Sequence, residues 1–445
     1  MVRARPAAGS GREGNRRTTS GGRGLPRALA AAALCLALTA LTGCTSLASP
    51  PRPTASASSA PPAPALPAGV GFQQLTRSLG PGSPVRLTVL SIAPDARARV
   101  TGAHGAGMAK AKTVRALADS VGAVAAVNGT YFDIATGRNH SGYEGDPIGL
   151  YAEHGRVLSE ALNGRPALLV GREGGRIVAR VAEAATTGRL RAADGARREL
   201  DGVNRVAGLI LGCGGVGGDR LLSTGRYQQE PSNGLCTDPD EVVSYNAQWG
   251  ADSPSGPLGS TEALLSPDGT VIGTRSPAGG PLPAGGGSLY GIGHGATWLR
   301  AHARTGTRMA VSLRMTDPAG APLPGPVETA VGGSVRLLRG GITDPDAARL
   351  GGERQPRTIA AVKADGTLLL VVIDGRAKGV SVGATGPEAA SLVRSLGAVD
   401  AVNLDGGGSA TAVVRGQVRN KPRETEGEPV TERPVADAIA VLPGG

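Results

Sequence analysis

The chain has 445 residues, which is long enough to bury one large core or two modest ones. Its formal net charge is +11, but no cluster of Lys and Arg interleaved with aromatic residues occurs, so the sequence does not indicate nucleic-acid binding. Aromatic residues make up only 2% of the chain, so Leu, Val, Ile and Ala must supply the core.

The first 43 residues have the features of a secretory signal rather than of a folded domain. Seven arginines precede an apolar run over residues 28–41, which is too short for a comfortable membrane span. The arrangement from Leu41 to Cys44 resembles the bacterial lipobox, in which the cysteine becomes the acylated first residue. We therefore predict a lipoprotein signal peptide over residues 1–43, lipidation of Cys44, and an extracytoplasmic protein anchored to the cell membrane by its lipid. Ordinary secretion is the alternative.

The segment after the signal is a predicted tether. Residues 44–69 are rich in Pro, Ala and Ser and cannot bury a core, so we expect an extended linker. Removing the signal takes seven Arg and one Glu from the chain, and the net charge falls from +11 to +5. Mild positive charge suits an anionic substrate or a negatively charged cell envelope. The folded body is predicted over residues 70–445 as a single globular domain.

Short strand patterns recur along this body, with few helical ones. The expected strands and hairpins cover residues 85–92, 148–158, 166–170, 264–272 and 368–373. The stretches 275–288 and 317–326 are rich in Gly and Pro and read as surface loops. These patterns predict an α+β fold with mixed or antiparallel sheets, a few helices and a loop-rich middle.

Two segments repeat one pattern. Residues 117–128 (LADSVGAVAAVN) and 392–403 (LVRSLGAVDAVN) are identical at 8 of 12 positions. Each predicts the end of an amphipathic helix, a glycine stop and a short buried strand that ends in Asn128 or Asn403. We expect the two strand ends to face one groove. Chance resemblance in a chain rich in Ala and Val is the alternative.

The second unit runs into a glycine triplet. Asp405 is followed by Gly406, Gly407, Gly408 and Ser409. Successive glycines allow positive φ and turn backbone N–H groups outward, which makes a concave anion site. A carboxylate beside an anion site indicates chemistry on a phosphorylated or otherwise acidic substrate. A tight turn between strands is the alternative.

Cysteine and histidine usage bears on disulfides and metals. Cys213 and Cys236 remain beyond the signal, and in an oxidising exterior we predict a disulfide between them. The five histidines show no ligand-like grouping, so we expect no zinc site and no cofactor. A divalent cation held by aspartates stays open as an alternative.

Eight short motifs follow one another from about residue 85 to residue 441. They are Asn128-Gly129-Thr130-Tyr131-Phe132, Gly145-Asp146-Pro147-Ile148-Gly149, Gly202-Val203-Asn204-Arg205, Gly332-Gly333, Arg354-Gln355-Pro356-Arg357-Thr358, Asp374-Gly375-Arg376, Asn403-Leu404-Asp405-Gly406-Gly407-Gly408-Ser409 and Arg433-Pro434-Val435. Together they resemble the phosphodiester glycosidase family. The middle, from about residue 186 to residue 325, departs most, which leaves the specificity for the leaving group open.

The resemblance implies hydrolysis of a sugar-1-phosphodiester, with an N-acetylglucosamine-like sugar released from a phosphorylated glycan or envelope polymer. Phosphate is already a good leaving group, so the site needs cations around it and a carboxylate for the oxocarbenium-like centre or the water. Asp405 is the preferred nucleophile or general base. Asp374 and Asp146 are weaker catalytic candidates.

The remaining candidates bind substrate. Arg357 and Arg376 offer bidentate donors to phosphate oxygens, and we expect Asn128 and Asn403 to bind sugar hydroxyls or to position the carboxylate. Tyr131 is a candidate for stacking on a sugar ring. The amides of Gly406, Gly407, Gly408 and Ser409 complete the predicted phosphate site.

One alternative belongs to another class of protein. A non-catalytic envelope module that binds phosphorylated glycans would use the same arginines and glycines, with Asp405 only ordering the loop. In either case the expected partners are a phosphorylated carbohydrate and, through the lipid, the membrane. The oligomeric state stays open.

Overall fold

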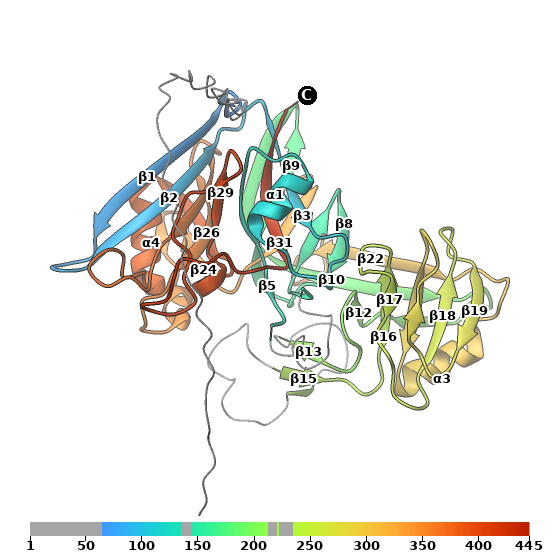
Figure 1. Ribbon diagram of the computed structural model, residues 1–445. Coiled ribbons are helices and arrows are strands. Elements are labelled where there is room, and N and C mark those ends of the chain that lie inside the picture. The colour runs from blue at the N-terminus through green and yellow to red at the C-terminus, as the bar shows by residue number, and fades with distance from the viewer. Residues whose placement is uncertain (1–64, 135–144, 212–219, 222–234, 445) are drawn as a thin grey trace, which may run out of the picture. The chain divides into compact units, whose positions relative to one another are not determined.

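The computed structural model describes residues 65–134, 145–211, 220–221 and 235–444 (Figure 1). The described residues belong to one compact unit, Pro61–Gly445. The predicted signal, Cys44 and most of the tether lie outside the described residues, so the domain boundaries and the lipidation stay predictions. Within the described part of the chain, no helix is long and apolar enough to cross a membrane.

The architecture is mostly β, with several antiparallel sheets and few helices. The expectation of antiparallel sheets with a few helices is confirmed, but strands outweigh helices more than the α+β prediction implied. The described helices are α1 (Val114–Ser120), α3 (Gly293–His302) and α4 (Gly386–Ser395), with the 3-10 turns η1 (Pro345–Leu350) and η2 (Gly407–Ser409). The prediction of a single domain stays a prediction.

Two sheets carry the repeated units. The larger has the order β1 (Val70–Ser78), β2 (Pro84–Ile92), β27 (Leu368–Ile373), β26 (Arg357–Lys363), β28 (Ala398–Asn403), β24 (Arg336–Arg339) and β25 (Ile342–Thr343). The smaller has the order β3 (Ala98–His104), β31 (Asp437–Pro443), β4 (Ala125–Asn128), β29 (Ala412–Val414) and β30 (Gln417–Val418). Helix α4 packs on the first sheet and α1 on the second.

Both predicted helix–strand units form as expected, and their ends are well defined. Thr113 caps α1, and Thr385 caps α4 in a capping box with Glu388. The glycine stops take positive φ, 67° at Gly122 and 91° at Gly397, where other residues would be strained. The shared local sequence therefore builds the same helix–turn–strand twice.

A third sheet packs against these two. Its order is β11 (Arg197–Glu199), β10 (Arg176–Arg191), β9 (Arg165–Glu173), β23 (Thr329–Gly332), β7 (Tyr151–Glu153) and β8 (Arg156–Ser159), and β22 (Ala310–Thr316) pairs with β10. Leu168, Val402 and Ile439 from the three sheets belong to one buried apolar cluster. This shared core fixes the strand ends that carry the candidate site.

The middle of the chain is more regular than expected. It forms a five-stranded sheet in the order β12 (Gly202–Val203), β16 (Val242–Asn246), β21 (Gly287–Gly291), β18 (Thr261–Leu265) and β19 (Val271–Arg275), with α3 against it. The short strands are β5 (Tyr131–Phe132), β6 (Pro147–Ile148), β13 (Ile210–Leu211), β14 (Arg220–Leu221), β15 (Leu235–Thr237), β17 (Asp252–Ser253) and β20 (Gly280–Pro281). Cys236 is buried in β15, whereas Cys213 lies outside the described residues, so the disulfide stays a prediction.

The predicted hairpins are confirmed. Strands β7 and β8 meet at His154 and Gly155, whose φ values of 51° and 73° are those of a tight hairpin turn. Strands β18 and β19 pair around the turn at Gly269. Strand β27 has the predicted bounds and is buried along its whole length between β2 and β26, because all six residues are apolar.

Candidate functional site

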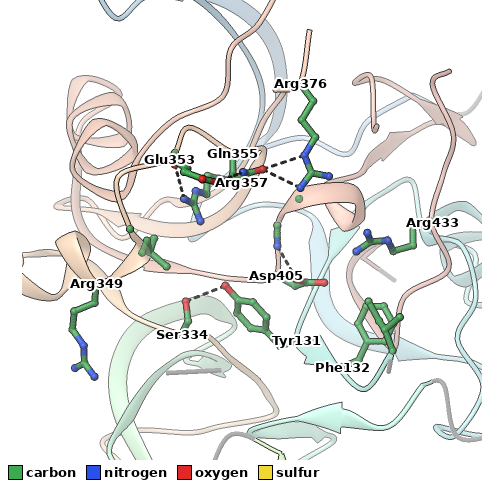
Figure 2. Close-up of a pocket in the computed structure, with 15 residues that line it drawn as sticks. Tyr131, Phe132, Ser334, Arg349, Glu353, Gln355, Arg357, Arg376, Asp405 and Arg433 are labelled. Carbon is green, nitrogen blue, oxygen red and sulfur yellow. Dashed lines mark hydrogen bonds between the residues drawn. The ribbon is translucent and has the colours of Figure 1, made fainter. Parts of the chain in front are cut away.

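A cavity of about 560 Å³ opens where the two repeated units meet (Figure 2). It is lined by Tyr131, Phe132, Ile134, Ser334, Arg349, Leu350, Gly351, Glu353, Gln355, Arg357, Arg376, Asp405, Gly406, Gly407 and Arg433. Six of the predicted site residues are among them, namely Tyr131, Arg357, Arg376, Asp405, Gly406 and Gly407. Residues nearly 300 positions apart in the sequence therefore share one opening.

The two strand-end asparagines connect the two repeated units through side-chain hydrogen bonds. Asn128 Nδ2 donates to the carbonyl of Asp405 at 2.8 Å, and Asn403 Nδ2 donates to the hydroxyl of Tyr131 at 2.8 Å. Each asparagine thus binds the loop that follows the other strand. The amide of Asp405 also donates to the carbonyl of Gly129 at 3.2 Å. The prediction that the two strand ends face each other is confirmed.

Neither asparagine lines the cavity. Both side chains are fully buried. Asn128 Oδ1 accepts from Thr358 Oγ1 at 2.6 Å and from the amide of Thr411 at 3.1 Å. In this structure neither side chain reaches the cavity surface, which favours the predicted positioning role over direct contact with sugar hydroxyls.

Asp405 combines burial with access to the cavity. It is 9% exposed, and its carboxylate accepts from the amide of Gly406 at 2.9 Å. Burial raises the pKa of Asp405 to about 6, while hydrogen bonding from Ser409, the positive charge of Arg433 and the Gly406 amide act in the opposite direction. At neutral pH the group is mostly ionised yet basic enough to accept a proton.

Four guanidinium groups line the same cavity, those of Arg376, Arg357, Arg433 and Arg349. Arg376 donates through Nε and Nη2 to Gln355 Oε1 at 3.1 and 2.9 Å, and through Nη1 to the carbonyl of Arg423 at 3.0 Å. Arg357 Nε donates to the carbonyl of Ala384 at 3.1 Å. These contacts fix the orientation of the guanidinium planes toward the opening (Figure 2).

Arg433 is the third guanidinium and was not among the predicted site residues. Its Nη1 donates to Ser409 Oγ at 3.1 Å, and its Nε donates to Glu424 Oε2 at 2.9 Å. It lies beside Gly408, where an added Cβ would come within 2.6 Å of Arg433 Nη2. A larger residue at this position would require the ends of the Arg433 and Glu424 side chains to shift.

The glycine turn forms, but it does not present an array of amides to an anion. The amide of Gly406 donates to Asp405, that of Gly407 to the carbonyl of Pro356 at 2.9 Å, and that of Ser409 to the carbonyl of Gly406 at 3.1 Å. Gly408 and Ser409 are buried and do not line the cavity. The prediction of an amide cradle is wrong for these three amides, because each of them already donates to a protein acceptor. The positively charged groups that line the cavity are the arginines.

The two weaker carboxylate candidates lie elsewhere. Asp374 Oδ1 accepts from Asn420 Nδ2 at 3.0 Å and from the amide of Lys421 at 2.9 Å, so it ties the end of β27 to a neighbouring segment. Burial raises its pKa. Asp374 does not line the cavity, which contradicts its assignment beside Asp405.

Asp146 lines a separate void of about 20 Å³ with Glu160 and Arg205. Burial, together with the charges of Glu160 and Asp133, raises its pKa well above 3.8. Arg205 is held there by Glu160 and Glu241. This geometry removes Asp146 from the predicted catalytic group, because it lines the small void and not the cavity that contains Asp405.

Sequence reasoning missed Ser334, Glu353, Gln355 and Arg433 as lining residues. The signal was present, since each lies within or directly beside a motif that carries the family resemblance. Ser334 follows Gly332-Gly333, and its Oγ lies 3.0 Å from the hydroxyl of Tyr131. Gln355 belongs to the Arg354–Thr358 motif and holds Arg376. Within the described ranges, no group of three or more His, Cys, Asp or Glu side chains is arranged to hold a metal ion.

Comparison with known proteins supports the family. The family model described as phosphodiester glycosidase matches residues 261–442, which include Arg357, Arg376, Asp405 and Arg433. The match begins inside the stretch that we expected to depart most and does not reach Asn128 or Tyr131. No curated protein matches the chain.

The chain is similar to several solved structures, three of which are as follows. A Burkholderia pseudomallei protein named as exported is 32% identical, with a TM-score of 0.71 over 81% of this chain and 74% of that chain. A hypothetical protein from Synechocystis is 19% identical with a TM-score of 0.63, and the match covers 84% of this chain and 62% of that one. The zebrafish N-acetylglucosamine-1-phosphodiester alpha-N-acetylglucosaminidase catalytic domain is 14% identical with a TM-score of 0.37, over 84% and 82% of the two chains.

The second of these similarities concerns the fold alone, and the third has too low a TM-score to carry an argument. The family model and the first solved relative carry the assignment, and the matched residues contain the carboxylate and the guanidinium groups of the cavity. The chain belongs to the phosphodiester glycosidase family.

Proposed function

We propose that this protein is an extracytoplasmic hydrolase that cleaves the glycosidic bond of a sugar-1-phosphodiester. One observation carries the proposal: Asp405, with a pKa of about 6, opens into the same cavity as Arg357, Arg376 and Arg433. A carboxylate beside several fixed guanidinium groups matches the charges of this reaction, in which a cationic sugar centre separates from an anionic phosphate.

The arginines bind the phosphodiester. Guanidinium groups pair with phosphate oxygens in a planar, bidentate way and keep their charge at any working pH. Because Gln355 and the carbonyl of Arg423 hold Arg376 in place, no reorganisation is needed as negative charge grows on the leaving phosphate. Phosphate leaves as an anion, so this half of the site requires no general acid.

Asp405 acts on the sugar side of the scissile bond. Its carboxylate either attacks the anomeric carbon or takes a proton from the attacking water. The amide of Gly406 fixes the carboxylate, and the reciprocal asparagines fix the backbone that carries it. Tyr131 and Phe132 line the cavity next to Asp405 and offer an aromatic wall for a sugar ring.

We further propose that the protein works outside the cytoplasm, attached by a lipid on Cys44. The signal-like segment of residues 1–43 supports export, and so does the exported name of the Burkholderia relative. The proline-rich segment after Cys44 would hold the folded unit away from the membrane. Labelling with a radioactive fatty acid, with and without Cys44→Ser, tests the anchor independently of the activity.

The activity test uses the full chain with UDP-N-acetylglucosamine and with a sugar-phosphate-sugar diester. We expect release of free sugar, measured by chromatography, from at least one of them. Asp119→Asn serves as a matched control, because Asp119 is an exposed carboxylate on α1. A wild type that binds these diesters without releasing sugar over a broad pH range and with added divalent ions would favour the non-catalytic binding module.

A further inference from the structure

A fifth guanidinium lies beside the cavity and has no acidic partner among the described residues. Arg165, at the start of β9, is half-buried, and its Nη1 is shielded from water without a hydrogen-bond acceptor. Leaving a charged donor without an acceptor costs more than a typical hydrogen bond contributes. A buried cationic donor of this kind indicates that its natural acceptor comes from a bound molecule.

The chain path places Arg165 next to the cavity wall. The carbonyl of Pro166, the next residue, accepts from the amide of Gly333 at 2.9 Å, and Ser334 follows on the cavity surface. The side chain of Arg165 is also close enough to Tyr131 and Arg349 for their charges to shift its pKa. Both of those residues line the cavity.

Arg349 adds a second positive charge at this end. It lies on η1, its side chain is 58% exposed, and its ion pair with Asp346 is a long one of 3.4 Å between exposed groups. Such surface pairs hold a side chain weakly, so the guanidinium is available to turn. Figure 2 shows Arg349 beyond Ser334, on the other side of Tyr131 from Arg433.

The two arginines affect each other electrostatically. Burial, together with the positive charge of Arg349, lowers the pKa of Arg165 to about 10, while Tyr131 acts in the opposite direction. Like charges close to each other are unfavourable, and an anion placed between them relieves both the repulsion and the missing hydrogen bond of Arg165. Binding of an anion is thus electrostatically favourable at the end of the cavity that is remote from Arg376 and Arg433.

We propose that Arg165 and Arg349 form a second anion subsite, which binds a phosphate or carboxylate group of the substrate other than the scissile phosphodiester. The inference rests on the proposed function for the identity of the first anion. The substrate class is then a molecule with two anionic groups, either a polymer of repeating phosphodiesters or a diphosphate. A substrate with a single negative charge would leave the subsite of Arg165 and Arg349 empty.

The test compares three substrates of the full chain. They are the methyl diester of N-acetylglucosamine-1-phosphate, UDP-N-acetylglucosamine, and a dimer in which one phosphodiester joins two N-acetylglucosamine units and the second unit carries its own 1-phosphate as a methyl diester. In Arg165→Gln and in Arg349→Gln, we expect the KM for at least one of the two substrates with two phosphates to rise about 10-fold more than the KM for the methyl diester. Arg165→Lys, which keeps the charge, should recover part of the difference.

Arg176→Gln is the matched control, since it removes one exposed positive charge far from Arg165. Arg176 begins β10 and lies opposite Glu173, the last residue of β9. Glu173 is eight residues from Arg165 along β9, which is about 27 Å of extended chain. We expect its KM ratios to equal those of the wild type. Thermal unfolding of each variant separates a local loss of binding from a loss of fold.

Each outcome decides the question. A selective effect on the dimer supports a repeating polymer, and one on UDP-N-acetylglucosamine supports a diphosphate. Equal changes on all three substrates, or none, overturn the second subsite. If the wild type releases no sugar, the proposed reaction fails, and calorimetric binding of the dimer then tests the subsite alone: weaker binding by Arg165→Gln than by Arg176→Gln supports it, and equal binding overturns it.

Discussion

The two repeated helix–strand units are identical at 8 of 12 positions and diverge after their asparagines, where one unit supplies a structural residue and the other supplies the carboxylate of the cavity. Asn128 and Asn403 are both fully buried, and each binds the loop of the other unit. Two positions later the first unit has Thr130 and the second has Asp405. Thr130 binds the buried carboxylate of Asp437, whereas Asp405 opens into the cavity. The common sequence positions the backbone, and the divergent residues supply the reactive group.

The asparagines themselves are not equivalent. Asn128 uses its amide and its carbonyl oxygen, in contacts with Asp405, Thr358 and Thr411. Asn403 uses its amide toward Tyr131, Ser334 and its own strand end, while its Oδ1 is buried without a hydrogen-bond partner within the described part of the chain. The first asparagine therefore contributes more to stability, and the second acts on the cavity through Tyr131.

The largest expected effect separates the two positions that follow the asparagines. Asp405→Asn removes the nucleophile or base, and we expect kcat to fall by about a thousandfold or more, measured as sugar release. Thr130→Val removes a hydrogen bond to Asp437 and should lower thermal stability with a much smaller change in kcat. Comparable losses of kcat in the two variants would contradict a structural role for Thr130 and a catalytic role for Asp405.

The next effect compares the asparagines. Asn128→Ala leaves the carbonyl of Asp405, the hydroxyl of Thr358 and the amide of Thr411 without partners, so we expect the free energy of unfolding to fall by about 3 kcal/mol. Asn403→Ala should cost less stability, because one of its own polar atoms has no partner to lose. Chemical denaturation measures both, and a larger loss in Asn403→Ala would contradict the ranking.

With rising pH, we expect activity to increase and the free energy of unfolding to decrease. Asp405 has a pKa of about 6 and works in its ionised form, so kcat/KM should rise as the pH passes through about 6. Asp437 has a folded-state pKa of about 7, raised mainly by burial above its ordinary value of 3.8. The folded chain thus holds this proton more tightly, and the stability it brings is full below pH 3.8 and is lost as the pH rises through 7.

The variant Asp437→Asn tests the predicted pH dependence of stability. The free energy of unfolding of the wild type should fall by on the order of 2 kcal/mol between pH 4 and pH 7 because of this group. The variant should show a flatter profile over the same interval. The control Asp119→Asn changes an exposed carboxylate and should leave the wild-type slope in place. An unchanged slope in Asp437→Asn would assign the pH dependence to other groups.

The smallest effect concerns the contact between Asn403 and Tyr131. Tyr131→Phe removes hydrogen bonds with Asn403 at 2.8 Å and Ser334 at 3.0 Å but keeps the aromatic ring. We expect KM to rise about three- to tenfold with little change in kcat, because the ring loses its fixed orientation. Tyr131→Ala, which also removes the ring, should raise KM further. Equal KM values in both variants would place the role of Tyr131 in its hydroxyl alone.

Much of the fold was predictable because its signals are local. The paired helix and strand patterns at residues 117–128 and 392–403 depend on apolar spacing and on a glycine stop, and both units formed. Strand β27 was predictable for the same reason, since a run of six apolar residues has to be buried on both faces. Of the regular sheet in the middle of the chain only the β18–β19 hairpin was predicted. Its other strands were missed, because they are short and separated by glycine-rich turns.

The site was only partly predictable. Sequence by itself determined that Asp405, two arginines and Tyr131 belong to one functional region, because ordered motifs carry that information. Only the tertiary structure decided that Asp374 and Asp146 lie away from the cavity and that the glycine amides already have protein acceptors. It also decided that Arg433 lies near the carboxylate and that Arg165 lies beside the other end of the cavity. The reason is physical: hydrogen-bond partners and burial depend on segments that meet across hundreds of residues, and these contacts decide which charge faces a ligand.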